Sequence, residues 1–440
     1  MFVVRRYVEK LRARGDLAVI DKSVSGEFEL AAICQAAQRE GERPLLFTNV
    51  AGTRVPVVTN LYGSRQRLCE LIGADDGLFC RRWSDLMTGA ALMDSASDTA
   101  EPLAYEELKV SDLPHLTYQA LDAGPYITAG VFLAKHPESG VPNLSFHRAM
   151  HVDENEVRIR LGTSHDLTAY QLAAEGQNQA LEAAILIGAP PAYIFAAAAS
   201  IPADASEMEL AAKLTSTPPP MRRCRHIDLD VPAETEIVIE GRILPGVLRP
   251  EGPFGEFKGL YVEREDNHVF EILGVTVRED AFYHGILCGS PEDMRLLELS
   301  VATQIYQALE KDLPGIIDVA CVPNVMNTVV KIDQQYQGHA DEVIRAAIDV
   351  NHDYSKIVVV VDEDVDINDV NDIVWAASNR ASAQRDMVIV RDLPGFYRDP
   401  HKDHWGRLGI DATKPWGRQA EFDRTTVPGV DTINLRDYFS

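Results

Sequence analysis

The sequence has no long apolar run. Nowhere in its 440 residues is there a run of roughly 18 consecutive apolar residues, the length that a membrane-spanning helix needs. The start, Met1–Tyr7, carries charges and predicts an amphipathic helix, without the apolar stretch and cleavage site of a secretory signal peptide. These absences argue against a membrane-spanning or secreted protein.

Positive charge is also scarce. The chain has 42 Lys and Arg against 67 Asp and Glu, which gives a net charge of −25. Nucleic acids and anionic membranes need clustered Lys and Arg, so the balance argues against both partners. The hydrophobic content of 46% is that of an ordinary globular protein, and the length predicts about three domains.

Paired cysteines are missing as well. The six cysteines are scattered without a Cys-x-x-Cys pair, which is typical of reduced, mostly buried thiols in a cytoplasmic protein. We therefore expect a cytoplasmic location. The sequence has no internal repeat and no low-complexity tract to suggest a solenoid or a disordered region.

Periodicity predicts an α/β (mixed α+β) protein in several parts. Residues 1–110 predict a small N-terminal α/β domain, and residues 111–291 predict a strand-rich, barrel-like domain. A long helix over 292–314 is expected to link it to a C-terminal α/β domain, 315–440, with a largely parallel sheet. Within these domains, five segments are predicted as follows: a helix over Asp166–Ile187, strands over Tyr193–Ala199, Arg222–Val231 and Glu234–Ile243, and a loose tail or a segment folding back over a site at Arg398–Arg418.

The segment Glu251–Glu256, Glu-Gly-Pro-Phe-Gly-Glu, places two acids on either side of a predicted irregular turn. Pro253 has no backbone N–H, and Gly252 and Gly255 tolerate unusual backbone angles. If the chain folds back, both carboxylates can face one cavity, as acid–base chemistry requires. The alternative is a Gly/Pro loop that carries two solvated acids.

Four other features stand out, each with an ordinary explanation when taken alone. They are Asn143–Arg148, Ser164-His165-Asp166, Glu207 and Gly406–Thr413. Taken alone, Asn143 is explained as a turn residue and Arg148 as an ordinary surface cation. His165 is explained as a helix-start or packing residue. Glu207 suits the positive end of a helix.

In this order and spacing, these features together with Glu251–Glu256 resemble the UbiD family of reversible decarboxylases, which use prenylated FMN. The resemblance runs from about residue 100 to the end of the chain. It implies a small leading domain, a central split-β-barrel domain that binds the flavin, a long linking helix and a C-terminal oligomerisation domain. The tail would then return to the cofactor site.

The resemblance also implies a divalent metal, usually Mn²⁺, held against the flavin phosphate by Asn143, His165 and Glu207. Hard oxygens with one imidazole suit Mn²⁺ or Mg²⁺ better than zinc. A K⁺ ion is expected nearby, although no residue identifies its ligands. Flavin contacts are expected at the following residues: Asn143, Ser145, Phe146, His147, Arg148, Arg160, Leu161, Ser164, His165, Glu207 and Arg407.

The same resemblance places a catalytic network on Arg148, Glu251 and Glu256. Arg148 would keep Glu251 ionised, and Glu256 would deliver a proton to carbon after CO₂ leaves. His284 and Arg295 lie near positions that shape substrate pockets in relatives. Arg295 could equally be a solvated residue on a helix face, as Arg407 could be a surface residue in the tail.

The expected function is therefore a carboxy-lyase that acts on an aromatic, heteroaromatic or α,β-unsaturated carboxylic acid. A flavin prenyltransferase would supply its cofactor, and the chain would form a homodimer or homohexamer. Two alternatives remain at this point. One is a non-catalytic, flavin-binding accessory subunit of a carboxylase complex, and the other is an acidic scaffold without cofactor.

Overall fold

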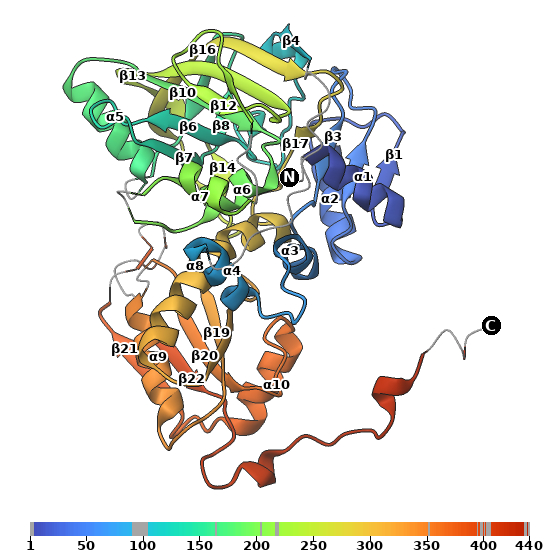
Figure 1. Ribbon diagram of the computed structural model, residues 1–440, viewed down its shortest axis with the longest axis vertical. Helices are drawn as coiled ribbons and strands as arrows, with labels where there is room; N and C mark the ends of the chain where they lie inside the picture. Colours follow the sequence, from blue (N-terminus) through green and yellow to red (C-terminus); the bar gives the residue numbers. More distant parts are fainter. Residues whose placement is uncertain are drawn as a thin grey trace. The chain divides into compact units, whose positions relative to one another are not determined.

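The computed structural model separates into two compact units, Met1–Gln304 and Ile305–Ser440 (Figure 1). Helix α8 (Pro291–Asp312) begins in the first unit and ends in the second, as the predicted linking helix should. The structure describes residues 4–89, 104–162, 165–202, 205–215, 220–350, 353–393, 395–396, 399, 401, 406–434 and 438.

The beginning of the first unit contains a four-stranded sheet in the order β1-β2-β3-β17. Its first helix buries Val4, Tyr7, Val8 and Leu11 on one face, because these residues recur with helical spacing. The helices and strands of this part are α1 (Val4–Arg14), β1 (Ala18–Ile20), α2 (Glu29–Arg39), β2 (Leu45–Phe47), β3 (Val57–Thr59), α3 (Arg65–Ile72), α4 (Phe79–Thr88) and β17 (Tyr283–His284).

The rest of the first unit is built on a curled, nine-stranded sheet in which all neighbouring strands are antiparallel (Figure 1). This curled half-barrel confirms the expected strand-rich, barrel-like domain. Its strands are β4 (Tyr105–Leu108), β5 (Tyr126–Ile127), β6 (Val131–Lys135), β7 (Pro142–Phe146), β8 (Ala149–His151), β9 (Glu156–Ile159), β10 (Leu181–Ile187), β13 (Ile237–Glu251) and β16 (Glu265–Arg278).

Short elements surround this sheet. Ser206 caps one of them, α7, by accepting a hydrogen bond from the Met208 N–H, as its position before an acidic turn predicts. The remaining elements of the unit are η1 (Val110–Asp112), α5 (Asp166–Gly176), α6 (Pro191–Ala198), α7 (Glu207–Lys213), β11 (Met221–Arg223), β12 (Asp230–Pro232), β14 (Phe254–Gly255) and β15 (Tyr261–Val262).

Two predicted elements in this unit are wrong. The expected helix Asp166–Ile187 ends at Gly176, and its second half is strand β10, which pairs with β6 and β13. A short apolar run has no period that separates a buried strand from a helix. The expected strand Tyr193–Ala199 is instead α6, which begins with Pro191 at its first position, where the fixed φ of proline favours a helix.

Two further predictions need smaller corrections. The expected strand Arg222–Val231 is the short hairpin β11–β12. The expected strand Glu234–Ile243 continues, as β13, to Glu251, so the first acid of the Glu251–Glu256 segment lies in regular structure. This extension is possible because β16 pairs with β13 as far as Glu251, across two irregularities in register.

The second unit contains a five-stranded sheet in the order β18-β19-β20-β22-β21. Its pairings are parallel for β19–β20 and β20–β22 and antiparallel at both edges, so the sheet is mixed and not largely parallel. Its elements are β18 (Ile316–Ala320), β19 (Asn327–Ile332), α9 (His339–Val350), β20 (Ile357–Asp362), α10 (Val370–Arg380), β21 (Met387–Arg391), β22 (Gly406–Asp411), η3 (Gln419–Phe422) and η4 (Val430–Thr432).

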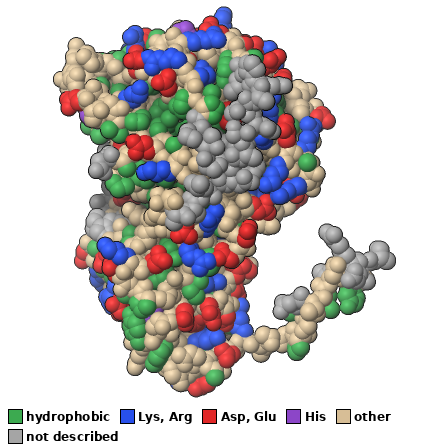
Figure 2. Space-filling model, viewed as in Figure 1, with side chains coloured by type: hydrophobic (Ala, Val, Ile, Leu, Met, Phe, Trp, Pro, Cys, Tyr) green, Lys and Arg blue, Asp and Glu red, His purple; other side chains and the backbone are tan. Residues whose placement is uncertain are grey.

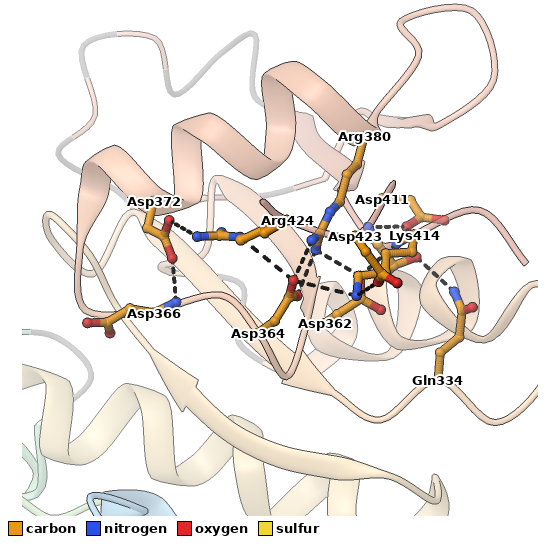
Figure 3. Close-up of polar contacts among 11 residues, drawn as sticks. Gln334, Asp362, Asp364, Asp366, Asp372, Arg380, Asp411, Lys414, Asp423 and Arg424 are labelled. Carbon is orange, nitrogen blue, oxygen red and sulfur yellow. Dashed lines mark hydrogen bonds and ion pairs between the residues drawn. The ribbon is translucent and has the colours of Figure 1, made fainter. Parts of the chain in front are cut away.

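Strand β22 corrects the prediction for Arg398–Arg418, because Gly406–Asp411 lies between β20 and β21 in the sheet. The chain after it is held by a network of charges (Figure 3). Arg380, with a side chain 1% exposed, binds both oxygens of Asp364 at 3.0 and 2.6 Å and Asp362 at 3.0 Å. Lys414 donates its N–H to Asp362 at 2.7 Å, which fastens the tail to the end of β20.

Other features agree with the composition. All six cysteines are free, and five of them are buried. Acidic and basic side chains are interspersed over the described part of the face in Figure 2. Among the described residues, no helix has both the length and the apolar character needed to cross a membrane.

Candidate active site

Arg148, Glu251 and Glu256 lie together in the first unit. The Arg148 guanidinium donates from Nε to Glu251 Oε1 at 3.1 Å and from Nη2 to Glu251 Oε2 at 2.8 Å. Its Nη1 lies 3.7 Å from Glu256 Oε1. The side chains are 11%, 0% and 13% exposed in that order, so one guanidinium bridges a buried acid and a partly accessible acid.

The turn between β13 and β14 separates these two acids. Gly252 has φ +92°, and a Cβ there would lie 3.1 Å from the Glu263 carbonyl oxygen. At Gly255 a Cβ would lie 2.6 Å from the Gln119 side chain. Only glycine tolerates both positions without displacement of its neighbours.

Asp122 holds the same turn from outside. Its carboxylate accepts the Gly255 N–H at 2.8 Å through Oδ1 and the Gln119 N–H at 2.8 Å through Oδ2. The Ala123 N–H donates to the Pro253 carbonyl at 2.9 Å. The backbone that leads to Glu256 is therefore fixed at Pro253 and at Gly255, by the Ala123 backbone and the Asp122 side chain.

Three residues that sequence reasoning missed complete this site. Tyr126 donates its hydroxyl to Glu251 Oε1 at 2.8 Å, and Asn267 donates its amide to Glu251 Oε2 at 2.9 Å. The Arg148 guanidinium lies over the Phe254 ring, 4.7 Å from its centroid. Tyr126 lies far from the motif in sequence and Asn267 lies beyond it on the next long strand, β16, so neither carried a signal, whereas Phe254 lies inside the motif.

The environment of Glu256 suits a proton donor. Burial raises the pKa of the Glu256 carboxyl above its usual value, and the nearby Asp293 carboxylate acts in the same direction. The positive charges of Arg148, Arg160 and Lys258 oppose the rise. A carboxyl group whose pKa lies closer to neutrality holds its proton until a developing carbanion takes it.

The expected metal ligands lie along one polar chain. Asn143 Nδ2 donates to Glu207 Oε2 at 3.3 Å, and Ser145 Oγ donates to Asn143 Oδ1 at 2.9 Å. Ser145 Oγ also lies 2.9 Å from His147 Nε2, and the His147 and His165 rings are 5.0 Å apart. The structure therefore brings Asn143 and Glu207 into contact and places His165 at the other end of this chain.

These donors have the chemistry that Mn²⁺ or Mg²⁺ needs. Burial lowers the pKa of His165, so its imidazole is neutral and able to coordinate a metal, and Gly162 leaves room for the ring. Burial raises the pKa of Glu207, a cost that a bound cation would offset. Among the described residues no group of three His, Cys, Asp or Glu side chains is arranged to hold a metal, so a complete site needs the Asn143 amide and an external ligand.

The remaining expected flavin contacts lie on or near the same strands. Arg160 forms an ion pair with Glu265, and its backbone N–H donates to the Arg148 carbonyl at 3.4 Å. Phe146 ends β7 and is partly exposed, and Leu161 is buried. Ser164 lies outside the described residues.

The last three expected site residues, His284, Arg295 and Arg407, lie on three other elements, β17, α8 and β22. His284 is fully buried, with Nε2 3.0 Å from Glu292 Oε1. Arg295 donates to Glu298 at 2.6 Å along α8. Arg407 lies on β22 in the second unit, where burial lowers the pKa of its guanidinium.

Comparisons with known proteins cover nearly the whole chain. Profiles for the N-terminal, Rift-related and C-terminal domains of 3-octaprenyl-4-hydroxybenzoate carboxy-lyase (UbiD) match residues 8–87, 94–291 and 295–412. The chain is 32% identical over 430 residues to the anhydromevalonate phosphate decarboxylase of Methanothermobacter thermautotrophicus, with 96% of this chain and 99% of the relative covered.

Two solved structures of the UbiD-class enzyme HmfF from Pelotomaculum thermopropionicum are also similar. The first is in complex with FMN and has 33% identity and a TM-score of 0.90. The second is an evolved dimeric form in complex with prenylated FMN and has 32% identity and a TM-score of 0.86. In both comparisons 100% of each chain is covered, so the similarity includes the residues of both units.

Proposed function

Since this chain belongs to the UbiD family of carboxy-lyases, we propose that it uses prenylated FMN to remove CO₂ from an unsaturated, aromatic or heteroaromatic carboxylic acid. One observation supports the assignment of residues: Arg148 lies between Glu251, which is fully buried, and Glu256, which is partly exposed. A fully buried Glu251 serves as a fixed anion, and a more accessible Glu256 serves as the acid.

The chemistry is divided between the cofactor and these side chains. Prenylated FMN supplies the electron sink for the carbon that loses CO₂. Arg148 lies next to Glu256 and orients its carboxyl group. After the carbon–carbon bond breaks and CO₂ leaves, Glu256 gives its proton to the same carbon, so that a carbon–hydrogen bond forms, and solvent then returns a proton to Glu256.

Asn143, His165 and Glu207 would hold Mn²⁺ or Mg²⁺, with the flavin phosphate as the external ligand. The neutral imidazole and the buried carboxylate support this assignment. Ser145, Phe146, His147, Arg160 and Leu161 would contact the flavin around that site. K⁺ would accompany the metal, and its ligands are not assigned.

The similarity to an anhydromevalonate phosphate decarboxylase directs the choice of substrates. It favours an α,β-unsaturated acid that carries a phosphate as the first compound to try, followed by aromatic and heteroaromatic acids. The complete set of Arg148, Glu251 and Glu256 argues against an accessory subunit without activity. A flavin prenyltransferase would supply the cofactor, and the chain would act as a homo-oligomer.

The test compares protein produced with and without a flavin prenyltransferase. Only the first preparation should show visible absorbance from the modified flavin and release CO₂ from a member of the substrate panel. In that preparation Glu256→Gln should lower kcat by roughly 10²- to 10⁴-fold, the usual contribution of a general acid, while flavin absorbance is retained.

Glu279→Gln is the matched control, because Glu279 is an exposed glutamate in the same unit. It should turn over at the parent rate. Turnover by Glu256→Gln at the parent rate would remove the proton-donor assignment. Equal colour and activity in the two preparations would remove prenylated FMN from the proposal.

A further inference from the structure

We propose that Tyr126 and Asn267 are positioning residues that lock the Glu251 carboxylate, and through it the Arg148 guanidinium, in the orientation that proton transfer from Glu256 requires. The inference rests on the proposed function and deepens it. Neither residue belongs to the motif that identified the site. Both act on the reaction through Glu251, without contact to the reacting carbon.

Four donors converge on the two oxygens of Glu251. Oε1 accepts from Tyr126 Oη at 2.8 Å and from Arg148 Nε at 3.1 Å. Oε2 accepts from Asn267 Nδ2 at 2.9 Å and from Arg148 Nη2 at 2.8 Å. Because a carboxylate has about four lone-pair sites, each oxygen is filled by one charged and one neutral donor. The carboxylate therefore has no freedom to rotate without breaking a bond.

The two neutral donors are held by the sheet itself. Tyr126 lies on β5, opposite Met150 of β8. Met150 follows Arg148 by two positions, so this pairing brings Tyr126 close to the arginine. Asn267 lies on β16 opposite Arg249 of β13, two residues before Glu251. Strand pairing thus sets the distance from each donor to the carboxylate, and neither depends on a loop.

Phe254 completes the enclosure. Its ring lies 4.5 Å from the Tyr126 ring and 4.7 Å from the Arg148 guanidinium carbon. The aromatic face attracts the cation and covers one side of the planar guanidinium. With Nε and Nη2 bound to Glu251, the third nitrogen, Nη1, faces Glu256 at 3.7 Å.

This geometry divides the work of the two acids. Glu251 has its lone pairs occupied and serves as a fixed anion, whereas Glu256 keeps the looser contact with Arg148. Burial and the Glu251 carboxylate raise the pKa of Tyr126 far above its usual value, so the phenol keeps its proton and stays a donor. Loss of either neutral donor would let the Glu251–Arg148 pair turn away from Glu256.

The experiment uses Tyr126→Phe, Asn267→Leu and the double variant, each loaded with prenylated FMN. Each single change removes one charge-assisted hydrogen bond and should lower kcat by about 10- to 100-fold, with KM within about threefold of the parent. The double variant should lose less than the product of the two single losses, because both donors act through one carboxylate.

Tyr118→Phe is the matched control. Tyr118 is also a buried tyrosine with one hydroxyl contact, but its partner is Thr128 at 2.9 Å. This variant should keep the parent kcat. A parent kcat in both Tyr126→Phe and Asn267→Leu would overturn the inference, and so would losses that multiply.

A second measurement needs no cofactor. Arg148 in the flavin-free chain should react with phenylglyoxal several-fold faster in Tyr126→Phe and Asn267→Leu than in the parent or in Tyr118→Phe, as read by peptide mass spectrometry. Unchanged Arg148 reactivity in both variants would overturn the lock. An inactive parent with faster Arg148 modification in the variants would instead refute the proposed function and leave the lock standing.

Discussion

Glu251→Gln replaces one carboxylate oxygen with an NH₂ group at a fully buried position of the site. The Glu251 carboxylate is 0% exposed, and every group directed at it is a donor, from Arg148, Tyr126 and Asn267. An amide in this place offers one acceptor oxygen and an NH₂ group that would face donors. Arg148, whose side chain is 11% exposed, would lose its buried counter-ion.

The size of the effect follows from that enclosure. Removal of one partner from a buried ion pair costs about 3–5 kcal/mol, because the remaining charge stays desolvated. In a unit of this length each kcal/mol lowers the melting temperature by roughly 2–4 °C, so we expect a fall of about 10 °C. A surface pair gives the comparison, since Arg242 and Glu271 are 45% and 35% exposed.

Thermal unfolding followed by circular dichroism measures the difference. Glu271→Gln should cost less than about 1 kcal/mol, as exposed ion pairs do. The double variant Arg148→Met/Glu251→Gln should be more stable than Glu251→Gln alone, because it removes the stranded charge, although both should be inactive. A double variant less stable than the single one would refute the reasoning that an unpaired buried guanidinium causes the loss.

Three shorter predictions concern other parts of the chain. Glu207→Gln should abolish the dependence of flavin binding on Mn²⁺ in a fluorescence titration; an undiminished dependence would contradict Glu207 as a ligand. Burial, and the His115 ring at 4.0 Å, lower the pKa of His151 to about 4, so the folded state binds fewer protons than the unfolded state between pH 4 and about 6.5. Stability should therefore fall on acidification through that range, by at most about 1.4 kcal/mol per pH unit from this group, and His151→Gln should flatten the slope of melting temperature against pH; an unchanged slope would refute it. Arg380→Met removes the buried guanidinium that binds Asp364 but leaves that acid its longer contacts with Lys414 at 3.6 Å and Arg424 at 3.7 Å. It should therefore cost about 1.5–3 kcal/mol in urea unfolding, the usual loss for hydrogen bonds to a charged group, whereas a loss below about 0.5 kcal/mol would contradict the role of Arg380 in Figure 3.

The sequence predicted that three charged side chains share one site, but not which residues support them. Arg148, Glu251 and Glu256 carry charges in a recognisable order, and the structure brings all three into contact. Tyr126 and Asn267 reach Glu251 only through strand register. Which residues of two strands lie opposite each other leaves no local pattern in the sequence, so these contacts had to be observed.

The errors in secondary structure have a related cause. Leu181–Ile187 reads equally well as the end of an Ala-rich helix or as a buried strand, and its place between β6 and β13 decides the matter. For Tyr193–Ala199 the deciding signal was local, because Pro191 begins the helix, and it was outweighed by the β-forming residues after it.

The different environments of two acids only five positions apart follow from where a strand ends. Up to Glu251, pairing of β13 with β16 fixes the backbone and directs the first carboxylate into the sheet, where fixed donors surround it. At Gly252 the backbone takes a positive φ that strand pairing does not allow, and the second carboxylate emerges beyond the turn. Because Glu256 lies after that turn, it keeps partial access to solvent and one long contact to Arg148, as a group that must release and regain a proton requires. A change that extended the strand through Gly252 would give both acids the same environment and would remove the difference on which the proposed chemistry depends.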